Sequence, residues 1–354
     1  MRTFDALDDS GGGHCSPLQL KRRELTMPPT PNSSLYFDVL PRDAPKLQDC
    51  FSCTDTMIDL QSVPLSGGIL VETIACSLDP YMRNRMRPVN EPGDMPAFPL
   101  GEVLNGFSVG VVIRSETTDF AAGQHVYGFM PYRKYNVFGA CDGASVSTPM
   151  GTLKILANPY NLPWRYFVGI LGMSGQTAYY GLKDVSDPKP GETIFVSAAA
   201  GAVGQVVVQL AKAMGLRVIA SCGSIEKEKM LKKLGADHVI NRHTSSISEE
   251  LKKYGPIDIY FDNVGGATLE AAISSAAMNA RFRIKIEALV VTDWHEKYAE
   301  EFYDVMQQKV ASGEIKYREH VYCGLKHGGQ GMADLMTGKN IGKAVIVLDG
   351  KWLS

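Results

Sequence analysis

From residue 192 onward the chain alternates short apolar runs with amphipathic segments, and this alternation constrains the fold more than any other feature. The expected strands are 192–198, 217–223, 237–241 and 257–263. The expected helices between and after them are 202–215, 224–235, 246–255 and 267–278. Strands joined by helices pack as parallel neighbours through right-handed crossovers. The sequence therefore predicts an α/β region with a doubly wound parallel sheet.

The part of the chain from Leu35 to about Gly128 has a different sequence pattern. Its short apolar runs are separated by glycine and proline, and the clearest are 67–78, 106–113 and 123–130. Runs of this kind are typical of a small, mostly β domain. Towards the other end of the chain we expect a strand at 283–291, a long helix at 295–313 and a last strand at 342–348 that returns to the β domain.

A glycine-rich turn follows the first strand of the α/β region. Ala198, Gly201 and Gly204 form A-x-x-G-x-x-G, with Ala202 and Val203 between the glycines, and a helix begins there. Small residues allow a tight turn and close approach of a pyrophosphate, which the helix N-terminus attracts through its free N–H groups. Close helix–strand packing also requires small residues, but the position within a strand–helix array favours a dinucleotide site.

The end of the second strand indicates which dinucleotide binds. An NAD site places Asp or Glu there to bind the ribose 2′-hydroxyl, and this chain has Gly223 and Ser224 instead. Lys227 and Arg242 lie nearby in the sequence, and cations with hydroxyls suit a 2′-phosphate. Each charge alone could be an ordinary solvated side chain. Together with the missing acid they favour NADP over NAD.

Composition excludes several classes of protein. The formal net charge of −2 gives no basis for binding nucleic acid or an anionic membrane, and no apolar run approaches transmembrane length. The seven cysteines are scattered and odd in number, which is typical of a reduced protein inside the cell. We therefore expect a cytoplasmic protein without nucleic-acid or membrane partners.

The metal-ligand pattern of a zinc dehydrogenase is not found in the sequence. Such a site needs thiolate, imidazole and carboxylate ligands, but no Gly-His-Glu precedes the 106–113 strand. Cys50 and Cys53 have no second cysteine pair, so incidental cysteines are the better interpretation. A Tyr-x-x-x-Lys pair of the short-chain dehydrogenase type does not stand out either. We therefore predict chemistry without a metal.

The chain resembles the zinc-independent medium-chain dehydrogenase/reductases. Within them it is most similar to the NADP-dependent alkenal double-bond reductases (the leukotriene B4 12-hydroxydehydrogenase/prostaglandin reductase group). The segments that carry the resemblance span nearly all of 35–348 and are 77–86, 170–182, 197–212, 222–237, 260–266 and 338–345. The resemblance implies a GroES-like β domain with an inserted Rossmann domain. The expected boundaries are a disordered extension over 1–33, a GroES-like substrate domain over 34–160 and 310–354, and an NADP-binding Rossmann domain over 161–309.

The resemblance also implies an activity. Members of the group reduce the C=C bond of α,β-unsaturated aldehydes or ketones with NADPH, so the expected partner is a small electrophilic enal or enone. A homodimer is one possible assembly. A dehydrogenase or quinone-type reductase of a secondary-metabolite pathway is an alternative, and a catalytically impaired NADPH-binding protein is another.

Several residues match the motifs of the group. Tyr81 matches a tyrosine near the substrate and is the catalytic candidate, although a packed ring with a satisfied hydroxyl is an equal alternative. The residues implied to lie along the cofactor, besides those of the two phosphate sites, are Met173, Thr177, Asn263, Gly265 and Asn340. Asn340 could instead only shape a turn.

One region departs from the group. Relatives have a further strand and an active-site loop before the strand expected at 283–291, and the sequence near 279–284 has no segment that matches either. The loss would expose strand edges and open the wall around the nicotinamide. A mis-assembled reading frame, a variant of weakened activity and closure by neighbouring segments are the three explanations. We favour the first.

Overall fold

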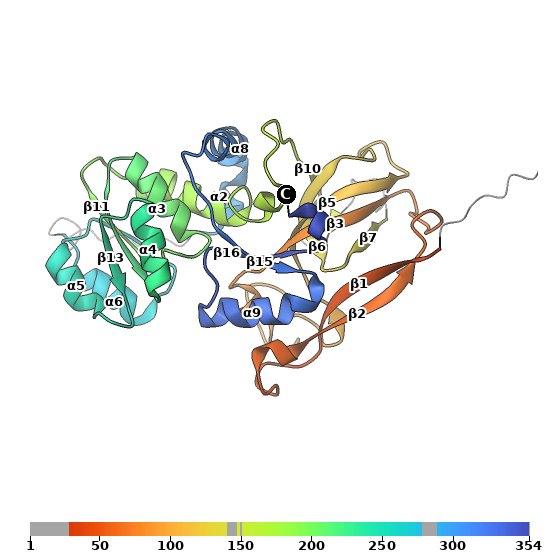
Figure 1. Cartoon of the computed structure of the whole chain (residues 1–354), viewed down its shortest axis with the longest axis horizontal. Helices are drawn as coiled ribbons and strands as arrows, with labels where there is room; N and C mark the ends of the chain where they lie inside the picture. The colour runs from red at the N-terminus through yellow and green to blue at the C-terminus, as the bar shows by residue number, and fades with distance from the viewer. Residues whose placement is uncertain (1–27, 140–146, 149–150, 278–288, 354) are drawn as a thin grey trace, which may run out of the picture.

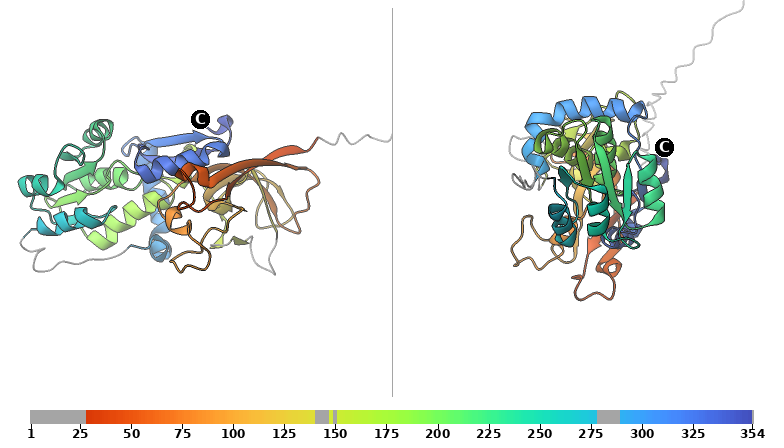
Figure 2. Two further views of the ribbon diagram at one scale, coloured as in Figure 1. Left: turned by 90° about the horizontal axis from the view of Figure 1, so that it is seen from below. Right: turned by 90° about the vertical axis from the view of Figure 1, so that its left-hand side faces the viewer.

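The computed structural model describes residues 28–139, 147–148, 151–277 and 289–353. The molecule is elongated, with antiparallel β-structure at one end and a parallel sheet with its helices at the other (Figure 1). Helices α2 (Met173–Tyr180) and α8 (His295–Ala311) lie between the two ends (Figure 1). Figure 2 gives the same arrangement from two further directions.

The predicted strand–helix alternation is confirmed. The strands of the parallel sheet are β11 (Thr193–Val196), β12 (Arg217–Cys222), β13 (His238–Asn241) and β14 (Ile259–Phe261). The helices that alternate with them are α3 (Gly204–Ala213), α4 (Ile225–Lys233), α5 (Ile247–Tyr254) and α6 (Gly266–Ser274). The strand order is β13-β12-β11-β14, so the chain reverses direction across the sheet at β11. This order of parallel strands is that of a Rossmann-type sheet.

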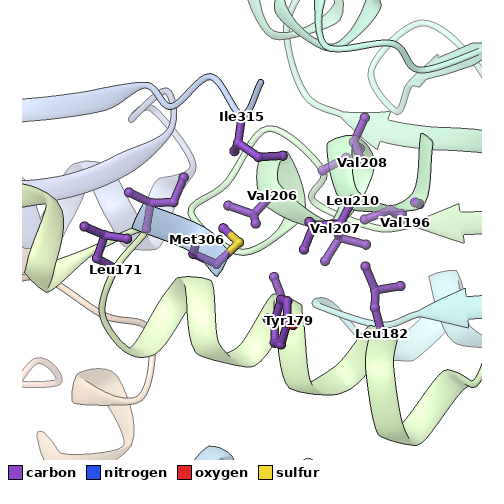
Figure 3. Packing of buried hydrophobic residues seen from close by; sticks show 14 of the residues in the cluster. Leu171, Tyr179, Leu182, Val196, Val206, Val207, Val208, Leu210, Met306 and Ile315 are labelled. Carbon is purple, nitrogen blue, oxygen red and sulfur yellow. The ribbon is translucent and has the colours of Figure 1, made fainter. Parts of the chain in front are cut away.

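Helix α3 is buried because it packs against both the sheet and α2. Its first eight residues, from Gly204 to Ala211, are all buried. Figure 3 shows Tyr179 and Leu182 facing Val207 and Leu210 in this cluster. This packing fixes the position of α3 and of the glycine turn at its N-terminus.

The antiparallel part contains two larger sheets. A three-stranded sheet has the order β2-β1-β4 and consists of β1 (Thr30–Phe37), β2 (Phe51–Ile58) and β4 (Glu102–Val103). A seven-stranded sheet has the order β10-β6-β5-β3-β16-β15, with β7 also paired to β3. Its strands are β3 (Ile69–Ser77), β5 (Asn105–Ser115), β6 (His125–Pro131), β7 (Tyr135–Phe138), β10 (Lys154–Ile155), β15 (Glu319–Cys323) and β16 (Lys343–Val347).

The predicted return of the last strand to the β domain is confirmed. Strand β16 pairs antiparallel with β3, and every residue of both strands is buried. Both strands are covered on their two faces, which explains why they read as continuous apolar runs. The ends of the chain therefore build one sheet together, as expected for a GroES-like domain.

Short elements complete the described fold. They are the helices α1 (Met82–Arg85) and α9 (Gly328–Thr337), the strands β8 (Ser147–Thr148) and β9 (Gly151–Thr152), and the single turns η1 (Leu47–Cys50), η2 (Trp164–Val168), η3 (Gly181–Ser186), η4 (Val291–Trp294), η5 (Leu325–His327) and η6 (Gly350–Trp352). Within the described ranges, no helix is long and apolar enough to cross a membrane.

Two glutamines of α3 hold the segment that leads from α8 into β15. Gln205 accepts from the Arg318 amide at 2.9 Å and donates to its carbonyl at 3.1 Å. Gln209 makes the same pair of bonds with Lys316, each at 2.8 Å. The two side-chain amides satisfy the backbone N–H and C=O groups of Lys316 and Arg318, which a neighbouring strand would otherwise satisfy. They therefore fix the segment that connects the two parts of the molecule.

Two sequence predictions differ from the structure. Residues 30–33 were assigned to the N-terminal extension, but they form the start of β1 and pair with β2 from Ile58 to Asp55. The strand expected at 283–291 is wrong at its end, because Leu289 and Val290 lie outside any strand and Val291 begins η4. The rest of that strand, the gap expected near 279–284 and residues 1–27 lie outside the described residues.

Candidate active site

The glycine turn between β11 and α3 has one residue in the left-handed region. Ala198 has a φ of +44°, a backbone conformation that residues with a Cβ adopt at a free-energy cost. A Cβ on Gly204 would lie 2.5 Å from the Cα of Ala199, so this glycine is required by packing. A Cβ on Gly201 would meet only the Ala198 carbonyl, at 3.1 Å. Gly201 therefore leaves its outer side open to a ligand.

The amides beside Gly201 fit an anion. In the described part of the chain, the N–H groups of Ala202 and Val203 donate no backbone hydrogen bond. They precede α3, whose partial positive charge is at this end. Free amides on an open glycine turn at a helix N-terminus suit the pyrophosphate expected from the sequence.

A cluster of cationic side chains follows β12. Gly223 continues the chain after the strand, and the Ser224 hydroxyl caps α4 by accepting from the Lys227 amide at 3.2 Å. The Lys227 ammonium donates to the Gly338 carbonyl at 2.6 Å. Burial lowers the pKa of Lys227, and the positive charge of Arg242 adds to this effect while Cys222 and Glu226 oppose it. The two cations therefore lie near each other, which suits a dianionic phosphate.

Met173 and Thr177 share one partly exposed face of α2. They are one turn apart, whereas the residues between them and the three that follow are buried. The Thr177 hydroxyl donates to the Met173 carbonyl at 2.8 Å, which fixes its methyl and hydroxyl on that face. Both residues are therefore available to line the position where a flat ring would lie.

Tyr81 lies directly before α1, and its hydroxyl is buried. The hydroxyl has no hydrogen-bond partner of standard geometry among the described residues. Burial raises the pKa of Tyr81 above its usual range, the charge of Asp79 adds to the rise, and Arg85 and the backbone amide of Phe107 oppose it. The hydroxyl is therefore protonated at neutral pH, and its catalytic role stays a prediction.

Three residues beside Tyr81 were not identified from the sequence. Burial raises the pKa of Tyr127 well above its usual value, the charges of Tyr303, Asp79 and Tyr81 add to the rise, and the backbone of Met173 opposes it. Burial raises the pKa of Tyr303 to about 12, and the amide of Gln176 opposes the rise. Gln176 is 1% exposed, and within the described ranges its Nε2 has no hydrogen-bond partner of standard geometry.

These side chains come from separate elements. Tyr127 is on β6, Gln176 on α2 and Tyr303 on α8, and the Phe107 ring of β5 stacks on Tyr127 at a centroid distance of 5.6 Å. The polar atoms of Tyr127, Gln176 and Tyr303 lie among aromatic rings near the first turn of α2. No motif marks them, because each is an ordinary aromatic or amide position in its own strand or helix.

The loop after β14 is held against the glycine turn. The Asn263 amide donates to the Ser197 hydroxyl at 2.8 Å, and its side chain donates to the Ser197 carbonyl at 2.9 Å. Asp262 accepts from the amides of Val264 and Gly265, each at 2.8 Å. Asn263 and Gly265 therefore lie beside the residue that precedes Ala198, with Gly265 at a φ of +73°.

Asn340 shapes a turn that touches the same region. Its side chain is buried and donates to the Gly342 carbonyl at 2.8 Å. The Gly342 amide donates to the Ala200 carbonyl at 3.0 Å, and Gly342 pairs with Gly201. The turn-forming alternative for Asn340 is thus present in the structure, and the turn still borders the predicted pyrophosphate site.

No cluster of three or more His, Cys, Asp or Glu that could hold a metal is found among the residues that the structure describes. Contacts of Ser197 and Ala200 link Asn263 and the Asn340 turn to the glycine turn, and Lys227 contacts Gly338 just before Asn340. Tyr81 belongs to the neighbouring aromatic group and is related to them through Tyr127 and Met173.

Comparisons with known proteins show which family the chain is similar to. Residues 38–146 match a family model described as the N-terminal domain of oxidoreductase, and residues 202–284 match one described as zinc-binding dehydrogenase. The chain is 37% identical to NADP-dependent oxidoreductase RED1 of Cochliobolus heterostrophus, over 89% of this chain and 97% of that protein. It is 35% identical to 2-alkenal reductase (NADP(+)-dependent) of Nicotiana tabacum, over 80% and 88%. The crystal structure of CurA from Vibrio vulnificus with NADPH superposes with a TM-score of 0.76 at 29% identity, over 90% and 99%.

Proposed function

Because the chain belongs to the zinc-independent, NADP-dependent medium-chain dehydrogenase/reductases, we propose that it reduces the C=C bond of α,β-unsaturated aldehydes or ketones with NADPH. The protein is an oxidoreductase that acts on a small molecule. The proposal adds the class of substrate and the roles of individual residues.

The observation that carries the proposal is the buried hydroxyl of Tyr81. Among the residues described, it has no hydrogen-bond partner of standard geometry, only the backbone amide of Phe107 opposes the rise of its pKa as a donor, and burial keeps it protonated. A carbonyl oxygen placed there would accept this O–H and be stabilised as negative charge develops on it. Such a donor performs the task that a zinc ion performs in metal-dependent relatives.

The cofactor residues follow from the same geometry. The amides of Ala202 and Val203 would hold the pyrophosphate, and Lys227 and Arg242 would hold the 2′-phosphate. Met173 and Thr177 would flank the nicotinamide, with Asn263, Gly265 and the Asn340 turn bordering the middle of the cofactor. When bound, NADPH supplies a hydride to the substrate.

The other groups near Tyr81 control water and protons. Tyr127, Tyr303 and Phe107 surround the space beside Met173 with apolar rings, which limits access of water to the reacting carbon. The buried amide of Gln176 faces the Tyr303 hydroxyl without a hydrogen bond of standard geometry, so it would be a second donor for a substrate oxygen. Hydride transfer would leave an enolate, and a proton would then have to reach its α-carbon, for which the Tyr81 O–H is the candidate donor.

The test is turnover by the purified full chain. NADPH consumption with a 2-alkenal and with an enone is followed at 340 nm, and product analysis distinguishes a reduced C=C bond from an alcohol. Tyr81→Phe should lower kcat about 100-fold, whereas Tyr160→Phe, at an exposed tyrosine, should leave it unchanged. Activity on quinones or alcohols alone would replace the proposed substrate class. NADPH binding without any turnover would identify a catalytically impaired protein.

A further inference from the structure

The imidazole of His243 lies beside the cationic cluster after β12. A Cβ on Gly223 would lie 3.2 Å from Arg242 Nε, 3.4 Å from His243 Nε2 and 3.5 Å from Arg242 Nη2. The guanidinium and the imidazole are therefore neighbours beside the backbone that follows the strand. A Cβ at position 223 would crowd these nitrogens, whereas glycine leaves them accessible to a ligand.

The charges around these nitrogens favour an anion. The titratable and charged groups on the loop of His243 and on the elements next to it are Arg242, Cys222, Glu226, Lys227, Lys339, Glu249 and Glu250. Two of these acids are engaged elsewhere, since Glu226 pairs with Arg318 and Glu250 with His238, each at 2.7 Å. In the described part of the chain, neither Arg242 nor His243 has a carboxylate partner within 4 Å. Arg242 and His243 are both exposed, so a ligand can reach them.

On the basis of the proposed function, we propose that His243 binds the 2′-phosphate of NADPH together with Arg242 and Lys227, and that protonation of its imidazole strengthens this contact. A histidine changes charge between about pH 5 and 8, and the second proton of a phosphate monoester leaves near pH 6. The imidazolium would therefore meet a phosphate that still carries most of its charge. NADH has no phosphate at this position, so its binding does not depend on His243.

The experiment is a fluorescence titration of the full chain with NADPH and with NADH at pH 6 and pH 8, at constant ionic strength. The variants are His243→Gln, which keeps a hydrogen-bonding side chain without the titration, and His327→Gln, at another exposed histidine in η5. At pH 6, His243→Gln should weaken NADPH binding about threefold to tenfold relative to the unmodified chain. At pH 8 the two should agree within about twofold.

The variant and the unmodified chain are compared at the same pH, where the phosphate of NADPH has the same charge for both. A difference between their affinities therefore does not come from titration of the phosphate. NADH affinity should be unchanged by His243→Gln at either pH, and His327→Gln should bind both cofactors like the unmodified chain. Equal NADPH binding by His243→Gln and the unmodified chain at pH 6 would overturn the assignment while leaving the proposed function intact. A loss of the same size at both pH values would overturn the role of protonation. An unmodified chain that binds no NADPH would overturn both proposals.

Discussion

The ammonium of Lys343 lies 2.8 Å from a carboxylate oxygen of Asp79, and the two side chains are 1% and 3% exposed. Lys343 also donates to the Leu78 carbonyl at 2.6 Å, and the Ser77 hydroxyl donates to Asp79. The pair joins β16 to the residues that lead into Tyr81. Because Gly342 is bonded to Ala200, the same strand end touches the glycine turn. The pair thus relates the position of Tyr81 to that of the predicted cofactor turn.

Removing one member of this pair should lower the free energy of unfolding of the protein. Lys343→Met would leave the Asp79 carboxylate buried without its cation, and we expect a loss of about 3–5 kcal/mol in the free energy of unfolding. Denaturation in urea measures it. Lys232→Met is the control, because its exposed pair with Glu228 is worth about 0.3–0.5 kcal/mol. Similar losses for the two variants would contradict a structural role for the buried pair.

Ala198→Gly should stabilise the chain. Glycine adopts the φ of +44° found at this residue without steric cost, and its greater freedom in the unfolded chain offsets part of the gain. We expect a net gain of about 0.5–1 kcal/mol, measured as a rise in Tm. Ala199→Gly, at the next position and without a positive φ, should lower Tm instead. A lower Tm for both would show that Ala198 is not strained.

The two glycines that follow Ala198 should respond differently to alanine. Gly204→Ala would place a Cβ 2.5 Å from the Ala199 backbone and should cost about 1–3 kcal/mol of stability. Gly201→Ala meets the Ala198 carbonyl at 3.1 Å, so its main effect should be weaker NADPH binding. Thermal unfolding and a fluorescence titration of both variants test this separation. Normal NADPH affinity in a folded Gly201→Ala variant would argue against a pyrophosphate at this turn.

Lys227→Ala should change the preference between cofactors. Loss of the ammonium should weaken NADPH binding about tenfold, the effect of about 1.4 kcal/mol, and leave NADH binding unchanged. Isothermal titration with each cofactor gives both affinities. Lys229→Ala, at an exposed lysine on the same helix, is the control for charge. Equal weakening of NADPH and NADH would indicate a distorted site and not a lost phosphate contact.

The loop after β14 should become less stable in acid. Burial raises the pKa of Asp262, but hydrogen bonds from Gly265, Val264, Tyr260 and Ser197 outweigh it, so the pKa is lowered. A carboxylate with a lowered folded pKa stabilises the folded state above its unfolded pKa of about 3.9, and this contribution is lost as the pH falls through the folded pKa.

Asp262→Asn should therefore lower Tm at pH 7 and reduce the acid-side loss of Tm below about pH 4. Asp304→Asn, at an exposed carboxylate of α8, is the matched control. An unchanged acid limb for Asp262→Asn would show that the hydrogen bonds to Asp262 do not stabilise its charged form.

The parallel sheet, the glycine turn and the return of β16 could be predicted from the sequence, because the period of apolar residues and the position of glycine act locally. The cationic cluster could be predicted as well, since Lys227 and Arg242 follow the ends of neighbouring strands. The predictions were wrong at the start of β1 and at the end of the strand expected before η4. Where a strand starts and ends depends on pairing with segments that are distant in the sequence. The sequence could not identify the group around Tyr81, because Tyr127 and Tyr303 carry no motif. Only the tertiary structure brought Lys343 to Asp79 across 264 positions, because a buried charge is matched by packing and not by spacing along the chain.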